Sequence, residues 1–397
     1  MRHIDFFDLL LVSKDFAFYF KKIKSKVSKN VLYTNTEPSL YKPSKEVYKI
    51  VDIPDYMEVE LHNSSTKLKS IDINTYKGSM VNLTKYSNLK EFLTKHFNAK
   101  KRAQFNTYKK RLEKCFNISY KVYFGNIEKA EYDRLFKKFP EMIKKRFDLL
   151  GTEHYDLAVW DRYEQNSFSL INEKRACLFV IYDGNNPISI SLTPVMGKVL
   201  YGFVRGFDVN YSKFYLGFTD LIFQLEWCFN NNMEVFDLVK GVFPYKSKFT
   251  NSTYYFQNKI IYNTTSVSST CIALAKSLKI KSFYFIVKLL KKINIDTLYH
   301  SYINKKNDEK KIEKLSLNNE CMLYKTTILT SDFIVSKNHN TIDIRKSENS
   351  FLRKTVYDIL YTLQEPITSI TIYKETEERY ILKGIKKSYK ITATKAL

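Results

Sequence analysis

Glycine and proline are scarce in this chain of 397 residues, which contains 10 glycines and 8 prolines. Because these residues form most tight turns and loops, their scarcity argues against long irregular loops and low-complexity segments. No segment repeats itself at a spacing of about 20 to 50 residues, so the signature of a solenoid or propeller is also missing. The sequence therefore predicts a conventionally folded protein, long enough for more than one domain.

Cysteine and histidine do not form the patterns of a metal site. No two of the 5 cysteines form a Cys-x-x-Cys pair, which argues against structural zinc and against a disulfide framework. The 6 histidines are far apart in sequence, without a His-x-x-His or His-Glu-x-x-His spacing. Most cysteines lie in apolar runs, as expected of buried thiols in a reducing compartment. We expect no metal, and the motifs Gly-x-Ser-x-Gly and P-loop are absent as well.

Long hydrophobic runs are also missing. No run reaches the roughly 20 residues that a membrane-spanning helix needs. The N-terminal apolar run is too short for a signal peptide and is interrupted by Asp5, Asp8 and Asp15. We therefore expect a cytoplasmic protein, with peripheral contact at the inner face of the membrane as an option that the charge leaves open.

Acidic residues are outnumbered: 65 Lys and Arg stand against 41 Asp and Glu, a net charge of +24. Such a surface attracts nucleic acid, anionic lipid, nucleotide-linked donors or acidic glycans by salt-sensitive long-range forces. The alternative is that a chain rich in Lys, Ile, Tyr and Asn reflects a biased genome, and both interpretations stay open. The hydrophobic content of 44%, with 15% aromatic residues, excludes a disordered chain.

The stretch from Leu200 to Phe249 carries the strongest local pattern. Val199 to Val204 is β-branched and aromatic, which predicts a strand, and Glu234 to Val239 alternates in the same way. Between them, Thr219 to Asn230 has apolar residues at the spacing of one helical face. Strand, helix and strand form a βαβ-type unit, and Gly217 lies just before the helix. A helix N-terminus presents free N–H groups, which suit a phosphate or an oxyanion.

The second strand of this unit ends in the pattern Asp-x-x-x-Gly-x-x-x-Tyr-Lys-x-x-aromatic, made by Asp237, Gly241, Tyr245, Lys246 and Phe249. This signature resembles the Gcn5-related N-acetyltransferase (GNAT) superfamily, and within it the cellulose-biosynthesis-type or Fem-like branch. The resemblance covers residues 88–258. The helix entry, residues 215–217, differs from the Pro-Gly step usual in that family, and the family's Gln/Arg-x-x-Gly-x-Gly/Ala loop is absent.

The resemblance implies an α+β fold with a GNAT-like acyltransferase core, a mixed and mostly antiparallel sheet flanked by helices. Residues 1–87 would be an N-terminal α/β segment packing on the core, expected from the family to be a partial second copy of the fold. Residues 88–303 would be the acyltransferase domain with basic C-terminal helices. A charged linker over 304–316 and a small α+β module over 317–397 would follow, the module without an assigned function.

Three polar or rigid residues set expected helix boundaries. Ser87 is a candidate N-cap, and Pro140 is expected to break the helical region Ile127 to Leu150 or to begin a new first turn. Ser347 is the candidate cap of an amphipathic helix over Glu348 to Leu363.

Two segments are both helical and basic. Ala99 to Lys114 could hold a polyanion, although a solvated face is the more common role of such a helix. Thr264 to Ile295 is apolar and rich in lysine, so it could lie on an anionic membrane. It could equally pack its apolar face on the core and leave its lysines in water, and this second arrangement is the expected one.

Acyl transfer needs a group that manages the proton, charge that stabilises the oxyanion, and a site that holds the donor's phosphates. The catalytic candidates are Lys246, Asp208 and Tyr211, of which Lys246 is the strongest because the family places a matching lysine at the mouth of its cleft. The candidates for the donor site are Arg205, Tyr215, Gly217, Phe218 and Thr219. The candidates for the acceptor site are Asp237, Gly241 and Tyr245. Each also has a structural explanation, as a turn former, a packing residue or a surface lysine.

Three functions remain in competition. The first is an acyltransferase that uses acetyl-CoA or another acyl-CoA as donor and an amine or hydroxyl of a sugar or envelope precursor as acceptor. The second keeps the fold but takes its donor from aminoacyl-tRNA and acts on a peptidoglycan precursor. The third is a non-catalytic basic protein that binds nucleic acid or an anionic membrane.

Overall fold

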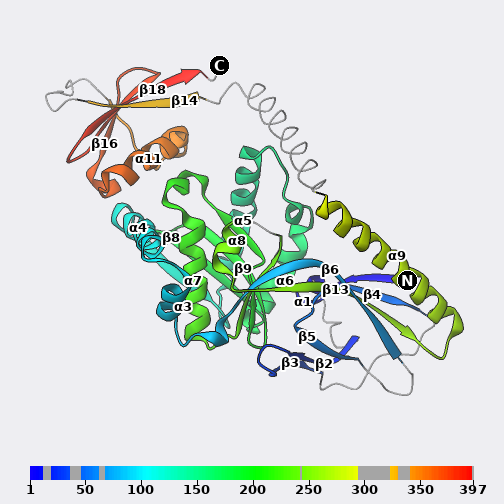
Figure 1. Ribbon diagram of the computed structural model, residues 1–397. Helices are drawn as coiled ribbons and strands as arrows, with labels where there is room; N and C mark the ends of the chain where they lie inside the picture. The colour runs from blue at the N-terminus through cyan, green and yellow to red at the C-terminus, as the bar shows by residue number, and fades with distance from the viewer. Residues whose placement is uncertain are drawn as a thin grey trace.

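The computed structural model describes residues 1–11, 19–35, 46–61, 68–241, 244–293, 322–329 and 340–395. In this part of the chain, the central element is a ten-stranded sheet (Figure 1). Its strands follow the order β1-β4-β13-β6-β12-β10-β9-β8-β7, and β11 pairs with β9. The strands are β1 (Arg2–Asp5), β4 (Tyr48–Pro54), β6 (Leu68–Asn82), β7 (Ile118–Tyr123), β8 (Ala176–Asp183), β9 (Asn186–Met196), β10 (Val199–Tyr201), β11 (Val204–Phe207), β12 (Val235–Lys240) and β13 (Ser252–Asn263).

The sheet is mostly antiparallel, and its pairings confirm the predicted fold class. β1 pairs with β4 and β10 pairs with β12 in parallel, whereas the other described pairings of this sheet are antiparallel. Helix α7 (Leu216–Asn230) connects β10 and β11 to β12. The predicted βαβ-type unit is therefore present, but Gly217 lies inside the first turn of α7 instead of before it.

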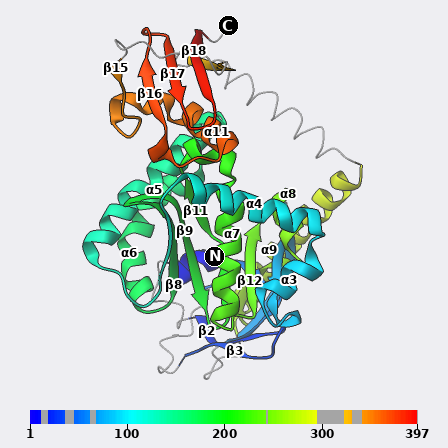
Figure 2. The same ribbon diagram turned by 90° about the vertical axis from the view of Figure 1, so that its left-hand side faces the viewer.

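Helices cover both faces of the sheet (Figure 2). On one face lie α3 (Leu89–His96), α4 (Ala99–Cys115), α7 and α8 (Pro244–Phe249), packed around a core that includes Leu221, Leu225 and Phe236. On the other face lie α5 (Lys129–Leu149) and α6 (Trp160–Asn172), with the short turn η2 (Tyr155–Val159) between them. The first helix, α1 (Phe6–Leu11), packs near Tyr201 of β10.

The N-terminal segment, residues 1–87, contributes three strands to the main sheet: β1, β4 and β6. Its other strands, β2 (Phe20–Ser25), β3 (Val31–Thr34) and β5 (Met57–Leu61), form a separate small sheet in the order β3-β2-β5. The short turn η1 (Leu83–Lys85) leads into α3. Because β6 pairs with both β12 and β13, the hydrogen-bonded sheet crosses the predicted boundary at residue 87. The partial second copy of the fold stays a prediction.

The C-terminal module has a five-stranded antiparallel sheet in the order β14-β18-β17-β16-β15. Its elements are β14 (Met322–Ile328), β15 (Asn340–Thr341), η4 (Ser347–Leu352), α11 (Arg353–Leu363), η5 (Ile367–Ser369), β16 (Thr371–Lys374), β17 (Arg379–Lys383) and β18 (Ser388–Lys395). Helix α11 packs on the turn η3 (Val209–Phe214) that precedes α7. Residues 304–316, the predicted linker, lie outside the described residues, as does Cys321.

Three predicted helix boundaries are corrected. Asn88 caps α3, because its side chain accepts the N–H of Glu91, while the Ser87 hydroxyl donates to the Glu91 carboxylate instead. Helix α5 continues through Pro140 without a break. The turn η4 begins at Ser347 with Lys346 as its cap, so Ser347 is not the cap of the helix that follows.

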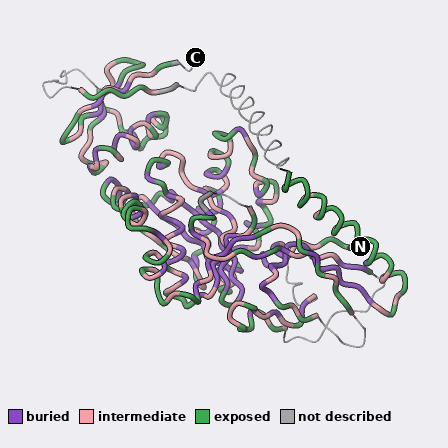
Figure 3. Tube along the Cα trace, viewed as in Figure 1, coloured by how far each residue is buried: buried purple, intermediate pink, exposed green. Residues whose placement is uncertain are grey.

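Helix α9 (Val267–Lys292) overturns the expected packing of this segment. Its buried residues are Ser269, Ala273 and Ser277, which face β6 and β13, and Ile280 is half-buried beside them. Most of its other large apolar side chains are exposed. The helix runs along the edge of the molecule and is exposed over most of its length (Figure 3). Among the described residues, no helix combines the length and apolar character needed to span a membrane.

Candidate functional site

The site begins at a fork in the main sheet. β10 runs parallel to β12 as far as the pair Tyr201 and Asp237, and the N–H of Gly202 donates to the Asp237 carbonyl over 2.7 Å. The chain then turns away, because β11 pairs with β9 and β12 is not among its described partners. Gly202 lies where the strands separate, and a Cβ there would come within 3.2 Å of Leu238. The fork therefore opens between β11 and the end of β12.

The end of β12 has an irregular backbone. Its register with β6 shifts between Asp237 and Lys240, which marks a bulge. Val239 in this bulge has a φ of 51°, and Gly241 has a φ of 92°. A positive φ is costly for a β-branched residue, and such strain is concentrated at functional sites in proteins. The strain at Val239 thus lies beside the fork.

Asp237 is fully buried on the face of β12 opposite α7. Its carboxylate accepts hydrogen bonds from the hydroxyls of Tyr56 and Tyr254, both over 2.7 Å, and from the N–H of Val239 over 2.8 Å. Burial raises the pKa of Asp237 to about 6, and these hydrogen bonds and the charge of Lys246 limit the increase. The tyrosines hold a carboxylate that would otherwise be strongly disfavoured in the core.

Lys246 projects from α8 and is only 6% exposed, so it is not a surface lysine. Its ammonium donates to the carbonyl of Lys240. Burial lowers the pKa of Lys246 to about 8; the charge of Asp237 opposes this decrease and that of Arg205 adds to it. Both charges act on Lys246 from the two strands that separate, Asp237 from β12 and Arg205 from β11. The ammonium therefore lies at the fork.

Arg205 joins the fork to α7. Its Nε lies 3.0 Å from the Asp220 carboxylate, and its Nη1 donates to the Gly217 carbonyl over 3.0 Å. Asp220 is fully buried and also accepts from the Ser191 hydroxyl and the Gln224 amide, over 3.0 and 2.7 Å. Burial raises the pKa of Asp220, and Arg205 opposes this increase.

Asp220 was not predicted as a site residue. An acid and an amide four residues apart on the apolar face of a helix are a recognisable signal, because a buried charge needs a partner. The sequence could have suggested the burial of Asp220, although not its pairing with Arg205.

The first turn of α7 contains the predicted donor-site residues. Tyr215 precedes the helix in the left-handed conformation, with a φ of 55°, and its ring stacks on Tyr108 at 4.1 Å between centroids. At Gly217 an added Cβ would be in ordinary van der Waals contact with Arg205, at 3.7 Å, so packing alone does not require a glycine there. Phe218 packs with Phe105, and Thr219 is buried.

Asp208 and Tyr211 have local structural contacts. The Asp208 carboxylate accepts the N–H of Asn210 over 2.9 Å and caps η3. The Tyr211 hydroxyl donates to Asp183 over 2.9 Å, and its ring packs against Tyr357 of the C-terminal module. These contacts account for both residues without chemistry, and their catalytic roles stay predictions.

The remaining predicted residues lie between β12 and α8. Gly241 has the positive φ noted above, which favours glycine. Tyr245 belongs to the first turn of α8, and its side chain lies outside the described part of the structure. Phe249, the aromatic residue of the signature, is fully buried against Phe97 and Phe105.

A second polar group lies at the end of β12. Asp52 of β4, which has a φ of 65°, accepts hydrogen bonds from the Tyr76 hydroxyl and the Lys240 ammonium. Burial raises the pKa of nearby Asp5, although Lys240 opposes the increase. No short motif connects these residues, because they are brought together by strands that are distant in sequence.

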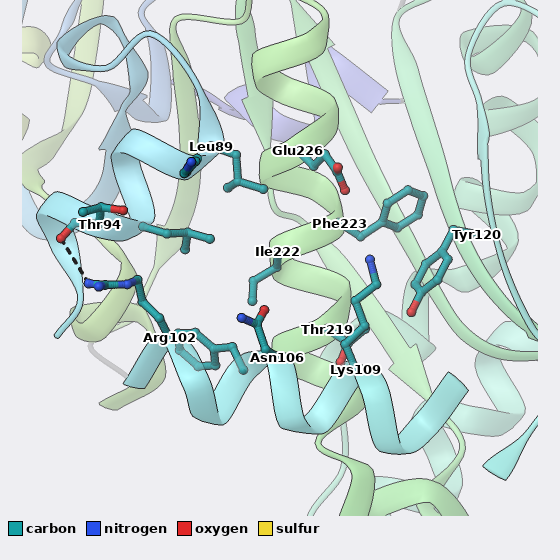
Figure 4. Close-up of a pocket in the computed structure, with 13 residues that line it drawn as sticks. Leu89, Thr94, Arg102, Asn106, Lys109, Tyr120, Thr219, Ile222, Phe223 and Glu226 are labelled. Atoms are coloured by element: carbon teal, nitrogen blue, oxygen red, sulfur yellow. Dashed lines mark hydrogen bonds between the residues drawn. The ribbon is translucent and has the colours of Figure 1, made fainter. Parts of the chain in front are cut away.

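A groove of about 550 Å³ lies on the outer side of α7, between α3, α4 and α7 (Figure 4). Its lining includes the apolar Leu93, Ile222 and Phe223 and the cationic Arg102 and Lys109. Lys246 and Asp237 are not among its lining residues, and Thr219 is the predicted site residue that contributes to it. Across the described ranges, no group of three or more His, Cys, Asp or Glu side chains could hold a metal ion.

The part of the chain that contains the fork is similar to a known protein family. Residues 99–247 match the family model described as an acetyltransferase (GNAT) domain. Residues 99–247 form a GNAT-type acetyltransferase domain. This GNAT domain extends from α4 to α8 and includes β10, β11, α7, β12 and Lys246. None of the curated proteins matches the chain.

Several solved structures resemble the chain at low identity. One is the C-terminal domain (DUF2156) of a protein from Agrobacterium fabrum assigned as a lysylphosphatidylglycerol synthetase, with 11% identity, a TM-score of 0.33, and coverage of 57% of this chain and 71% of that one. A conserved protein of unknown function from Bacteroides thetaiotaomicron has 8% identity and a TM-score of 0.34, with coverage of 55% and 70%. A third, from Staphylococcus epidermidis, has 11% identity and a TM-score of 0.27, with coverage of 55% and 73%.

Proposed function

We propose that this protein transfers an acyl group, most simply acetyl, from acyl-CoA to an amine or hydroxyl of a sugar or an envelope or polysaccharide precursor. The observation that carries the proposal is the buried Lys246 at the fork of a GNAT domain, between Arg205 and Asp237. The choice of acceptor class rests on the signature from Asp237 to Phe249, which resembles the Fem-like branch. We place the reaction in the cytoplasm.

Lys246 suits the handling of charge and protons in this reaction. The acceptor nitrogen or oxygen attacks the thioester carbonyl carbon, and the carbon–sulfur bond breaks to release the coenzyme as a thiolate. The Lys246 ammonium stabilises the negative charge on the carbonyl oxygen and gives its proton to the thiolate. It then regains a proton from the acceptor group. A pKa of about 8 makes both directions of this transfer accessible near neutral pH.

Asp237 would position Lys246 and would not take part in bond making. The carboxylate is held by Tyr56, Tyr254 and the N–H of Val239. Its negative charge favours the ammonium form of Lys246 despite the burial. This arrangement keeps a protonated lysine at a place where a neutral amine would otherwise prevail.

The donor fits the first turn of α7 by charge and by space. Gly217 lies in the N-terminal turn of α7, where helix N–H groups suit a phosphate and the missing side chain lets one approach the backbone. The Lys101 ammonium lies 5.7 Å from the Phe218 ring, which adds positive charge next to this turn. We therefore assign the donor's phosphates to the side of α7, with Arg205, Tyr215, Phe218 and Thr219 around them.

The acceptor fits the opposite side of β12. Asp52, Tyr76 and Lys240 offer a carboxylate, a hydroxyl and an ammonium, which are suitable partners for hydroxyl or amine groups. Gly241 follows Lys240 directly and Tyr245 comes four residues later, and we assign both to the acceptor side as well. We assign no metal to the reaction.

The test is acyl transfer by Lys246→Ala, with Lys248→Ala as a matched control. Lys248 belongs to the same helix but is exposed, so its loss removes an equal charge without touching the fork. Release of free coenzyme thiol from acetyl-CoA is measured with panels of amino and hydroxyl acceptors. We expect Lys246→Ala to lose at least about a hundredfold in kcat and Lys248→Ala to stay within about twofold of the native rate. Equal rates for the two variants would refute the role of Lys246.

A second candidate is supported by the charge of α4. This helix has several exposed cations, including Lys100, Lys109 and Lys110, and Arg102 lines its groove with α7. A ligase that takes its acyl group from aminoacyl-tRNA would use such a surface. Thermal unfolding with acetyl-CoA, with free coenzyme A and with bulk tRNA distinguishes the donors, because a ligand of the native state raises Tm. A salt-sensitive increase with tRNA alone would favour the ligase, and no response to any of them would favour a non-catalytic basic protein.

A further inference from the structure

Helix α9 is packed with its small residues inward. Ser269, Ala273 and Ser277 are buried, and Ala273 belongs to a cluster with Ile73 of β6 and Ile260 of β13. Small side chains let the helix approach the sheet closely along its inner face. Ile280 is half-buried against the same cluster. Most of the other large apolar side chains of α9 are exposed and therefore available to another partner.

The large apolar residues of α9 form a stripe on its outer face. Leu274, Leu278, Phe285 and Leu289 follow one another at spacings of four, seven and four residues, which place them on one side of a helix. Leu278 is 67% exposed and Phe285 is 63% exposed. At about 1.5 Å per residue, the helix is about 40 Å long, so this stripe is far larger than a scattered surface leucine.

The charge of α9 has one sign. The sequence from Val267 to Lys292 contains six lysines and no aspartate or glutamate. With 3.6 residues per turn, Lys281 and Lys288 border this stripe on one side. On its other side the exposed Ile286 and Leu290 widen the apolar face, with Lys279 among them and Lys276 beyond them. A broad apolar face flanked by lysines is the pattern of a helix that lies in the plane of an anionic membrane surface.

We infer that α9 docks the protein on an anionic lipid bilayer, with the stripe of Leu274, Leu278, Phe285 and Leu289 entering the boundary between headgroups and acyl chains. The lysines on both sides contact the anionic headgroups. This inference goes beyond the proposed acyl transfer and does not depend on it, since it rests on α9 alone.

The charge favours lipid over the other occupants of this stripe. A second copy of α9 placed against the first would bring two sets of six lysines together without an acidic partner. The charged stretch further along the chain, from Asn304 to Lys314, has five lysines and three acids, so its net charge has the same sign as that of α9. Anionic headgroups carry the negative charge that would pair with these lysines, whereas a second copy of α9 and the stretch from Asn304 to Lys314 both have a net positive charge.

Docking through α9 would bring the acceptor side of the site near the lipid. Tyr284, on the inner part of the helix, has a raised pKa because of its burial and the charge of Asp52, and Lys240 opposes this increase. Helix α9 therefore reaches the group of Asp52 and Lys240 described above. A membrane-bound acceptor could enter the site from this side.

The first experiment is flotation of the full chain with vesicles of pure phosphatidylcholine or of phosphatidylcholine containing about 30% phosphatidylglycerol. We expect binding to the anionic vesicles, at least about tenfold weaker on the neutral ones, and weakened by salt. The triple variant Leu278→Ser, Phe285→Ser, Leu289→Ser should bind at least about tenfold more weakly. The matched control is Ile385→Ser in the C-terminal module, which is 73% exposed and should leave binding unchanged.

Two further measurements distinguish docking through α9 from other outcomes. Cys271 is exposed on α9, whereas Cys115, Cys177 and Cys228 are buried, so a polarity-sensitive dye can be placed there in a Cys321→Ser background. Its emission should shift to the blue with anionic vesicles only. No vesicle binding by the native chain, no dye shift, or a triple variant that binds like the native chain would each overturn the inference. A native dimer that the triple variant converts to a monomer without any lipid binding would assign the stripe to a second copy.

Discussion

Helices α7 and α9 are both rich in apolar residues, but α7 packs its large apolar residues against the sheet, whereas α9 packs mainly small residues there. Helix α7 buries large residues such as Leu221 and Leu225 together with the charged Asp220. Helix α9 buries Ser269, Ala273 and Ser277 and exposes residues as large as Leu278 and Phe285. Helix α7 is held by apolar burial and by a paired charge, and helix α9 mainly by the close approach of small side chains.

The comparison shows what a helical pattern can determine. Spacing identifies the residues that share a face, but it does not indicate whether that face meets the core or an external partner. The size of the residues on the opposite face is an additional signal. A row of serine and alanine at intervals of four, as in Ser269, Ala273 and Ser277, favours close contact with a sheet, and the apolar face is then the outer one.

The largest effect should come from the buried charge of α7. In Asp220→Ala, Arg205 loses its carboxylate partner while it remains largely buried, which should lower the free energy of unfolding by about 3–5 kcal/mol. Glu226→Ala, on the exposed face of the same helix, should change it by less than about 0.5 kcal/mol. Urea unfolding measures both. Similar values for the two variants would mean that the Arg205 pair does not hold α7 in place.

A second prediction concerns pH, because α7 and the adjacent strand β12 each carry a fully buried acid, whereas α9 has no acidic residue. Asp237 has a pKa of about 6 in the folded chain and 3.8 as its ordinary value, so between these pH values the native state binds more protons than the unfolded state. The contribution of this group to stability should therefore decrease by up to about 3 kcal/mol as pH increases from about 4 to about 6. In Asp237→Asn this slope should disappear. The measurement is urea unfolding across that range, and equal slopes for both proteins would contradict the assignment.

The third prediction tests the inner face of α9. Ala273→Leu would force extra volume between α9 and the sheet, which should cost about 1–3 kcal/mol of stability. Ala275→Leu, two residues further along the same helix and on its exposed side, should cost less than about 0.5 kcal/mol. Thermal or urea unfolding compares the two. If both substitutions were harmless, α9 would not be seated on β6 and β13 through its small residues.

The sequence predicts the framework of the site better than its interior. The pattern from Val199 to Val239 gives the βαβ-type unit, because local spacing specifies a strand and a helix. The signature gives Lys246, because five residue types recur at fixed offsets. The fork itself is not visible, since nothing in the run from Leu200 to Val204 indicates that pairing with β12 stops at Gly202.

Contacts between residues that are distant in sequence cannot be predicted from local spacing. Tyr56 is 181 positions from Asp237, and its hydroxyl is indistinguishable in sequence from those of the other tyrosines. Asp52 and Lys240 are likewise 188 positions apart. Their pairing depends on β4, β13, β6 and β12 lying next to one another in that order, which long-range strand pairing decides.

The smallest effect on stability should come from a Leu→Ala substitution on the outer face of α9, although the same substitution should be severe in α7. Leu225→Ala removes a fully buried side chain and should cost about 2–5 kcal/mol. Leu278→Ala removes a side chain that is already 67% exposed, so it should change the free energy of unfolding by less than about 0.5 kcal/mol. Urea unfolding of both variants in the absence of lipid measures the contrast. A loss of more than about 1 kcal/mol in Leu278→Ala would show that the stripe on α9 is covered in solution. Leu278 would then behave like the buried Leu225, and the contrast between α7 and α9 would be wrong.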